Sequence, residues 1–294
     1  MAEKDISEKI LLDYNDVFAD IVNGLIFDGK QRIKPETLAN KQVKAMYKAD
    51  NGKLHEEERD IFKLWEECGI EIALCGLENQ SEPYKYMPAR VIGYDGAAYR
   101  EQLLNRKIKN LVPVVTIVLN FGSQKWNEPT TLKGLFEEIP SELKKYVNDY
   151  KIHVFDIAWL TEEEVARFKG DFKVVADFFV RRRENPDYFP DDPTELSHVD
   201  AVLKLLTVMT GDRRYEEVAI EQKGEVKTMC DVAERLVQKG IAQGNAQGFA
   251  QGRDTTLYEL VEAGDLSIKK AAKKAGVSEK KFKDNMLLTG HKLP

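Results

Sequence analysis

The stretch RDIFKLWEECGIEIALCGLENQ, residues 59–80, decides the fold of this chain. Two runs rich in β-branched and aromatic residues flank a short polar segment that ends in Gly69. This pattern is typical of a β-hairpin. In the second arm the period of two of a β-strand places one set of side chains on a common face: Ile70, Ile72, Leu74, Gly76, Glu78 and Gln80.

Hairpin topology brings Asp60, which opens the first arm, towards Glu78 near the end of the second. Two positions of the turn are compatible with the spacing. A turn centred on residues 67–68 sets Asp60 opposite Cys75, roughly 10 Å from Glu78 at about 3.3 Å per residue. A turn nearer Gly69, or a β-bulge, pairs the two carboxylates directly.

These residues predict a metal-dependent hydrolase of phosphodiesters. Two carboxylates at the end of a buried strand pair are costly unless they are paired or bound to a cation. Oxygen ligands suit Mg²⁺, with Mn²⁺ as a substitute, and such an ion can polarise a phosphodiester and activate water. We therefore expect Asp60 and Glu78 to hold the metal. Gln80 can orient water through its amide, although it supplies no positive charge.

The remaining sequence predicts an α/β core with a mixed sheet flanked by helices, followed by an all-helical C-terminal extension. Residues 28–58 are polar and predict loops and turns. After residue 160 the pattern is helical, interrupted by an acidic, proline-containing loop at 184–195. The other predicted elements are a helix at 14–27, a helix at 88–107, a buried strand at 112–122, a strand at 151–160 and a short helix capped by Thr161.

Two features mark the C-terminal part. Residues 240–252 repeat Gly-x-Ala-Gln, which places four glycines on one stripe of a helix. Glycine costs roughly 1 kcal/mol there relative to alanine, and close approach of a partner helix can offset this cost. The stripe is therefore a candidate for self-association, and a flexible linker is the alternative. The last 40 residues are rich in lysine and have the spacing of a helix-turn-helix, with Ser278 capping the second helix.

The composition is that of an ordinary globular protein, with 43% hydrophobic and 32% charged residues in 294. No apolar run is long enough to span a membrane, and the acidic start is unlike a signal peptide. We therefore expect a cytoplasmic protein. Three cysteines and four histidines show no zinc-ligand spacing. The net charge of −6 argues only weakly against a nucleic-acid partner.

The central block RDIFKLW…IEIALCGLENQ…MPARVIGYDGAAYREQL…VPVVTIVLNFG…W resembles the recombination-promoting nuclease (Rpn) or YhgA-like transposase family of the PD-(D/E)XK nuclease superfamily. The resemblance implies a restriction-endonuclease-like core, double-stranded DNA as substrate and Mg²⁺ as cofactor. Asp60 then matches the motif aspartate, Glu78 the acidic residue of the (D/E)XK element, and Gln80 its last position. The superfamily usually has lysine at this position, so the glutamine puts the rate of DNA cleavage in question.

The predicted division of the chain is a nuclease-like domain at 1–210, a helical linker with the glycine repeat at 211–253 and a helix-turn-helix-like tail at 254–294. For some other candidate residues the sequence gives less support for a functional role. Asp16 and Asp20, on the first helix, are expected to be exposed. The candidate DNA-binding residues, each with a structural alternative, are Arg90, Tyr94, Lys273, Lys274, Lys280 and Lys281.

Three functions remain open. The first is a metal-dependent DNA endonuclease that acts in recombination or transposition. The second is a catalytically inactive DNA-binding or assembly protein that keeps the nuclease fold, which the missing lysine motivates. The third is an interaction module built around the glycine-repeat helix.

Overall fold

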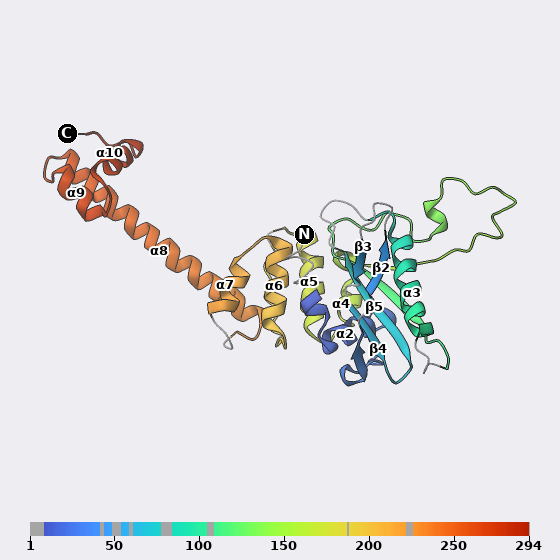
Figure 1. Ribbon diagram of the computed structural model, residues 1–294. Coiled ribbons are helices and arrows are strands. Elements are labelled where there is room, and N and C mark those ends of the chain that lie inside the picture. Colours follow the sequence, from blue (N-terminus) through green and yellow to red (C-terminus); the bar gives the residue numbers. More distant parts are fainter. Residues whose placement is uncertain are drawn as a thin grey trace. The chain divides into compact units, whose positions relative to one another are not determined.

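A computed structural model describes residues 9–41, 44–48, 54–58, 61–77, 84–104, 109–186, 188–221 and 226–293 of the chain (Figure 1). The chain forms two compact units, residues 1–233 and 234–294.

The first unit is built on a mixed five-stranded sheet with the order β1-β4-β5-β6-β7. The strands are β1 (Leu38–Asn40), β4 (Ile61–Trp65), β5 (Ile70–Leu77), β6 (Val114–Asn120) and β7 (His153–Asp156). Strand β4 runs antiparallel to β1 and β5, whereas β5, β6 and β7 are parallel to one another. The predicted mixed sheet with helices is therefore confirmed.

The β4–β5 hairpin is confirmed, and its register selects one of the two predicted turns. Ile61 pairs with Leu74 and Trp65 with Ile70. The turn at residues 66–69 is consequently centred on 67–68, and Gly69 closes it with a φ of +60°. A left-handed conformation of this kind suits glycine because it has no Cβ.

The prediction of loops and turns for residues 28–58 was wrong, because three strands lie in this segment. Strand β1 extends the sheet next to β4. Strands β2 (Lys44–Lys48) and β3 (Leu54–Glu58) pair with each other as a separate antiparallel ribbon. Backbone hydrogen bonds between strands do not require apolar side chains, so hydrophobic periodicity did not reveal these strands.

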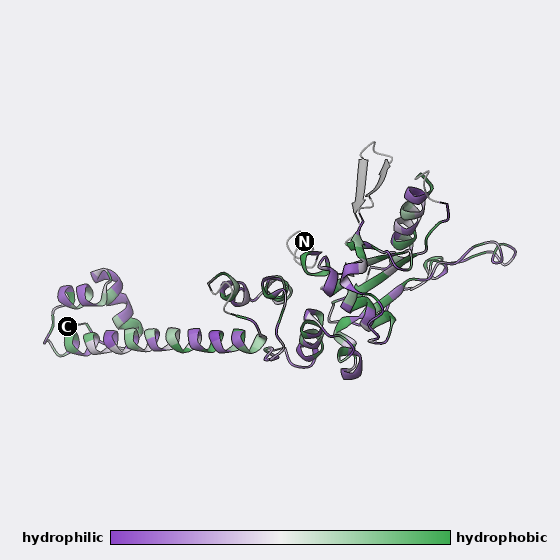
Figure 2. Cartoon of the chain, turned by 90° about the horizontal axis from the view of Figure 1, so that it is seen from below, coloured by the Kyte–Doolittle hydropathy of each residue, from purple (hydrophilic) through white to green (hydrophobic). Residues whose placement is uncertain are grey.

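Helix α3 (Met87–Leu104) covers one face of the sheet. Its Ala98 packs with Phe62 of β4 and Ala73 of β5, and its Met87, Val91 and Tyr94 pack on Val118 of β6. The helix runs along the strands in Figure 1, and the strands themselves are largely green in Figure 2. These contacts remove the apolar side chains of the strands from water. Such burial is the main source of stability when a helix packs on a sheet.

Buried carboxylates fasten α3 to the sheet. Asp95 accepts hydrogen bonds from Thr116 of β6, at 2.6 Å, and from the hydroxyl of Tyr150. Near the other end of the helix, Gln102 donates to the buried Glu71 of β5 at 3.0 Å. Buried polar groups are tolerated only when they are hydrogen-bonded, so these contacts fix the position of the helix along the strands.

Helix α2 (Asn15–Ile26) confirms the predicted first helix, and it buries Phe18, Ile21 and Val22. The Nζ of Lys63, which follows Phe62 on β4 and so points to the other face of the sheet, lies 5.7 Å from the centre of the Phe18 ring. Helix α2 therefore packs on the face opposite α3.

Short helices follow the sheet, as predicted. They are η3 (Ile157–Trp159), α4 (Glu162–Val165), α5 (Asp171–Glu184), α6 (Val199–Thr210) and α7 (Arg214–Glu221). Two 3₁₀ helices lie earlier in the chain: η1 (Pro35–Thr37) and η2 (Lys133–Leu135). The strand predicted at 151–160 is shorter, because residues 157–159 turn into η3. Thr161 caps α4 in a capping box with Glu164, as its sequence predicts.

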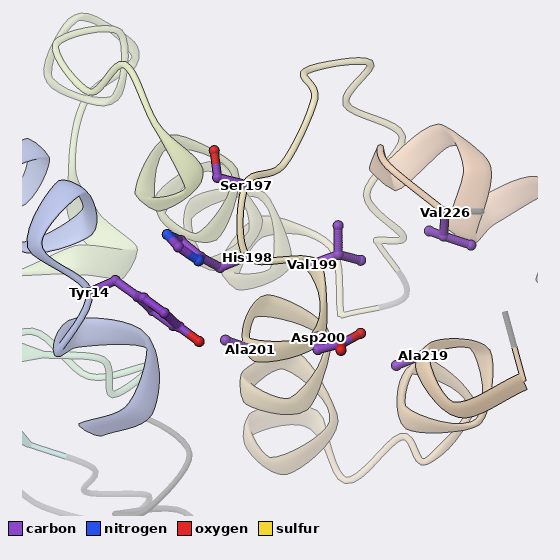
Figure 3. Close-up of a pocket in the computed structure, with 8 residues that line it drawn as sticks. All are labelled: Tyr14, Ser197, His198, Val199, Asp200, Ala201, Ala219 and Val226. Carbon is purple, nitrogen blue, oxygen red and sulfur yellow. The ribbon is translucent and has the colours of Figure 1, made fainter. Parts of the chain in front are cut away.

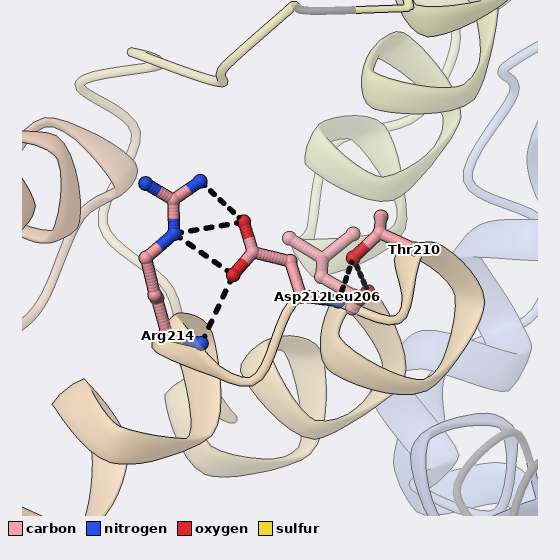
Figure 4. A network of polar contacts seen from close by, with 4 residues as sticks. All are labelled: Leu206, Thr210, Asp212 and Arg214. Carbon is pink, nitrogen blue, oxygen red and sulfur yellow. Dashed lines mark hydrogen bonds and ion pairs between the residues drawn. The ribbon is translucent and has the colours of Figure 1, made fainter. Parts of the chain in front are cut away.

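A polar network ties the end of α6 to the start of α7 (Figure 4). The hydroxyl of Thr210 donates to the carbonyl of Leu206 at 2.8 Å and accepts from the backbone N–H of Asp212 at 3.0 Å. The guanidinium of Arg214 donates to both carboxylate oxygens of Asp212, and this pairing lowers the pKa of Asp212. These bonds order the short connection between the two helices.

The second unit consists of helices. Helix α8 (Met229–Glu262) enters it from the first unit, and α9 (Ile268–Ala275) and α10 (Glu279–Leu288) follow. The glycine repeat thus lies in a helix, along which green and purple residues succeed one another in Figure 2. In the described part of the chain, no helix is long and apolar enough to cross a membrane.

Replacing Asp171 by alanine should lower the free energy of unfolding by about 2–4 kcal/mol. The buried Asp171 carboxylate accepts from the backbone N–H groups of Ser197 and His198, at 2.9 and 2.7 Å, where α6 begins. The variant leaves both donors without this acceptor. Urea unfolding measures the loss, with Glu101→Ala, an exposed carboxylate on α3, as the control. Equal stability of the two variants would contradict the capping role.

Candidate functional site

The parallel strands β5, β6 and β7 end in one row at the same edge of the sheet. Leu77 pairs with Asn120, and Asn120 pairs with Asp156. Ligands of α/β sheets bind outside the carboxyl ends of their strands. This carboxyl edge, defined by Leu77, Asn120 and Asp156, is therefore the candidate functional site of the first unit.

Asn120 and Asp156 form a hydrogen-bonded pair at the carboxyl edge. The Nδ2 of the buried Asn120 donates to the Asp156 carboxylate at 2.7 Å and to the carbonyl of Gln124 at 3.0 Å. The same carboxylate oxygen accepts from the backbone N–H of Trp126 at 2.9 Å. The pair holds the segment after β6 against the end of β7 and keeps a carboxylate at the edge.

The side chains of Asn120 and Asp156 were not predicted as site residues. A signal for both was present, since each is the polar residue that ends an apolar strand: VVTIVLN for β6 and HVFD for β7. The adjacency of parallel strands β6 and β7 could not be deduced from one sequence, because 32 residues, among them the short 3₁₀ helix η2, separate the two strands.

The predicted catalytic residues Asp60, Glu78 and Gln80 lie outside the described residues. The structure describes the residues that are next to them in the sequence. Ile61 opens β4 and pairs with Leu74, and Leu77 ends β5 at the carboxyl edge. Glu78 therefore directly follows, in sequence, a residue that pairs with Asn120.

The buried Lys63 is fully engaged in structural contacts. Its ammonium group donates to the backbone carbonyl of Asp13 at 2.8 Å, to the Asp13 carboxylate at 3.1 Å and to the side chain of Asn40. Burial lowers the pKa of Lys63, and the hydrogen bond to Asp13 opposes that shift. An ammonium has three donors, so these contacts satisfy Lys63 and leave it no donor for a substrate.

Arg90 and Tyr94 lie one turn apart on α3, as predicted. The Nε of Arg90 donates to the hydroxyl of Tyr94 at 2.5 Å, and the guanidinium lies 5.4 Å from the centre of the Tyr94 ring. The ring is buried against the apolar residues of the sheet. The arginine is half-buried, so it alone of the two presents a polar group near the surface.

The expectation of exposure is confirmed for Asp16 and was wrong for Asp20. Asp20 is only 5% exposed. Its carboxylate accepts from the backbone N–H groups of Lys169 at 2.7 Å and Gly170 at 2.9 Å. Burial raises the pKa of Asp20, although these two hydrogen bonds oppose the shift. The side chain joins α2 to the start of α5 and is therefore structural.

A pocket of about 300 Å³ lies between Tyr14 and the N-terminal end of α6 (Figure 3). The rings of Tyr14 and His198 stack at 3.6 Å. The Nε2 of His198 lies 2.9 Å from both oxygens of Asp16. Ser197 points away from the histidine in Figure 3, so the pocket does not hold the aligned serine and histidine of a hydrolase.

The remaining predicted DNA-binding residues are exposed in the second unit. Lys273 and Lys274 lie in the last turn of α9, and Lys280 and Lys281 lie in the first turn of α10. Among the described residues, no group of three or more histidines, cysteines, aspartates or glutamates is arranged to hold a metal ion. Cys68 and Cys230 are free thiols.

Comparison with known proteins gives one match. Residues 72–184 fit the sequence profile of a family described as "Putative transposase, YhgA-like". The match covers 113 of the 294 residues, which are called the YhgA-like segment below. The YhgA-like segment contains most of β5, all of α3, β6, β7 and α4, and α5 to its last residue, and so includes Asn120 and Asp156. Glu78 and Gln80 lie within it and Asp60 precedes it. No curated protein and no solved structure matched the chain.

Replacing Asn120 by aspartate should destabilise the YhgA-like segment by roughly 2–3 kcal/mol at neutral pH. The new carboxylate would face that of Asp156, and like charges raise the pKa of such a pair. The folded state then binds more protons than the unfolded state, so the loss should grow as the pH rises above about 5. Urea unfolding over a pH series measures it.

The control is Asn120→Leu, which removes the same amide without adding a charge. Its loss of stability should depend less on pH than that of the aspartate variant. Equal pH dependence in the two variants would contradict the close pairing of Asn120 and Asp156.

Proposed function

We propose that the chain is a metal-dependent DNA endonuclease with a restriction-endonuclease-like core, which acts in recombination or transposition. The observation that carries the proposal is the YhgA-like match, which begins on β5 and spans the carboxyl edge. The acidic residue Glu78 and the amide Gln80 follow this strand directly in sequence.

In this proposal the chain supplies oxygen ligands. Asp60 and Glu78 would hold the cation, Mg²⁺ or Mn²⁺, and their carboxylates fit its preference for oxygen. When bound, the ion lowers the pKa of water and offsets charge on the phosphodiester. Gln80 orients the attacking water through its amide. Asn120 and Trp126 would act as positioning residues, because they bind the Asp156 carboxylate at the end of β7.

A second candidate is a catalytically inactive DNA-binding or assembly protein with the same core. Gln80 stands where a nuclease of this superfamily usually has lysine, and an amide cannot stabilise developing negative charge as an ammonium does. The buried Lys63 is no replacement, because its donors are bonded to Asp13 and Asn40. This observation favours a slow enzyme or an inactive one over a fast one.

Nicking of supercoiled plasmid by the full chain separates the two candidates. We expect nicking with Mg²⁺ or Mn²⁺ and none with EDTA. Asp60→Ala and Glu78→Ala should each lower the rate by about 100-fold or more, since each removes a metal ligand. Glu67→Ala, an exposed carboxylate in the β4–β5 turn, is the matched control and should nick like the wild type.

Two results would contradict the endonuclease. One is the absence of nicking with every ion while binding of duplex DNA persists, which would favour the inactive protein. The other is nicking that survives in both Asp60→Ala and Glu78→Ala, which would move the active site elsewhere.

We also propose that α8 mediates self-association. Within the described residues, an added Cβ at Gly240, Gly244, Gly248 or Gly252 would meet nothing within 4 Å apart from the backbone of its own helix. Val237 and Ile241 lie on the same side of the helix by their spacing, and they are 61% and 58% exposed. A second copy of α8 could cover this face at close range, which would offset the cost of four helical glycines.

The double substitution Gly244→Leu/Gly248→Leu tests this proposal. Leucine favours a helix more than glycine does, so the helix itself should gain stability. Close approach of a partner would nevertheless be blocked, and we expect the mass in solution to fall from that of an oligomer to that of one chain. Light scattering after gel filtration measures it, with Ala246→Leu as the control, because the spacing places this exposed residue on the opposite side of the helix. A wild-type monomer, or an unchanged oligomer in the double variant, would contradict the proposal.

A further inference from the structure

The last three helices form a closed structural core of their own. Leu257, Tyr258 and Val261 of α8 pack against α9 and α10, and the rings of Tyr258 and Phe282 lie 4.8 Å apart. Arg253 donates to the carbonyl of Ala275 at the end of α9. The other buried members of this core are Ala271, Ala272, Ala275 and Met286. Helices α9 and α10 are therefore held rigidly by the end of α8.

The connection between α9 and α10 has the form of a helix-turn-helix. Three residues separate the helices, and Gly276 takes a φ of +74° at the end of α9. Val277 packs into the core, and its N–H donates to the carbonyl of Ala272 at 3.1 Å. The hydroxyl of Ser278 accepts from the N–H of Lys281 and caps α10. A short turn containing glycine between two packed helices is typical of this motif.

Positive charge is concentrated on this motif. Residues 266–294 contain eight lysines and two acidic residues, Glu279 and Asp284, a net charge of +6. The whole chain carries −6, so the remainder carries −12. Seven of these lysines are exposed on α9 and α10, and none forms an ion pair with another described residue: Lys269, Lys270, Lys273, Lys274, Lys280, Lys281 and Lys283. They form the lysine face of the motif.

We propose that the lysine face of α9 and α10 binds duplex DNA, with α10 in the major groove and the lysines of α9 on the phosphates. An α-helix with its side chains is about 10–12 Å wide, which matches a major groove about 12 Å wide. In helix-turn-helix proteins the second helix enters that groove and the first crosses the backbone. Ammonium groups without an internal partner are free to replace the counterions of phosphate.

Duplex DNA fits this surface better than a membrane does. A helix that lies on a membrane needs an apolar face to insert below its charged face. In α9 and α10 most of that face is already buried, because Ala271, Ala275, Phe282 and Met286 belong to the core. The exposed apolar residues Leu287 and Leu288 are confined to the last turn of α10. The proposed binding goes beyond the proposed endonuclease and does not depend on cleavage.

Fluorescence anisotropy of a labelled duplex with the full chain in EDTA tests the proposal without cleavage. We expect the triple variant Lys280→Gln/Lys281→Gln/Lys283→Gln to bind at least about tenfold more weakly at low salt. The slope of log affinity against log salt should fall by about 0.9 for each phosphate that the variant no longer neutralises. Lys273→Gln/Lys274→Gln should show the same effects at a smaller scale. Thermal unfolding of the variants should be unchanged, because all five side chains are exposed.

The matched control is Lys144→Gln/Lys145→Gln/Lys151→Gln, which removes three exposed lysines of the first unit and should bind like the wild type. Unchanged affinity and salt slope in the α10 variant would overturn the proposal, and so would an equal loss in the control. Binding to vesicles of anionic phospholipid in place of DNA, lost in the α10 variant, would overturn it in favour of a membrane. Failure of plasmid nicking with this binding intact would count against the endonuclease alone.

Discussion

The register of β5 between its two neighbours is the constraint on which the first unit depends. This strand pairs antiparallel with β4 on one side and parallel with β6 on the other. A slip of one residue would move every side chain of the strand to the opposite face. It would bring Glu71 out of reach of Gln102 and place Ile72 against α3. The same register carries Leu77 to the row of strand ends that includes Asn120 and Asp156.

Buried polar groups enforce this register from both faces. On the side of α3, Glu71 accepts from Gln102 and forms an ion pair with Lys41 at 3.2 Å. On the side of α2, the Lys63 ammonium meets Asp13 and Asn40. A buried charge that loses its partner destabilises a protein strongly, so these contacts disfavour alternative pairings more than they add to stability. These contacts thereby hold the carboxyl edge in place.

The sequence was most informative where the hydrophobic pattern was strong. The hairpin, the buried strand at 114–120, the helices α2 and α3 and the Ser278 cap were all predicted, because each depends on local spacing or capping chemistry. Strand β1 was missed since three residues carry too little periodicity. Asp20 was misplaced because its partners, the N–H groups of Lys169 and Gly170, are about 150 residues away along the chain. The pairing of Asn120 with Asp156 could not be predicted either, because it depends on which strands are neighbours in the sheet. The roles of Asp60, Glu78 and Gln80 remain predictions.

The proposed endonuclease requires a cation held by Glu78, which follows β5 in sequence. A titration of the full chain with Mn²⁺, followed by electron paramagnetic resonance, tests this directly. Free Mn²⁺ gives the strong signal, so the bound fraction is read without any nuclease activity. We expect saturable binding in the wild type that is lost in Glu78→Ala and retained in Glu67→Ala. No saturable binding in the wild type, or equal binding in Glu78→Ala, would contradict the proposed endonuclease.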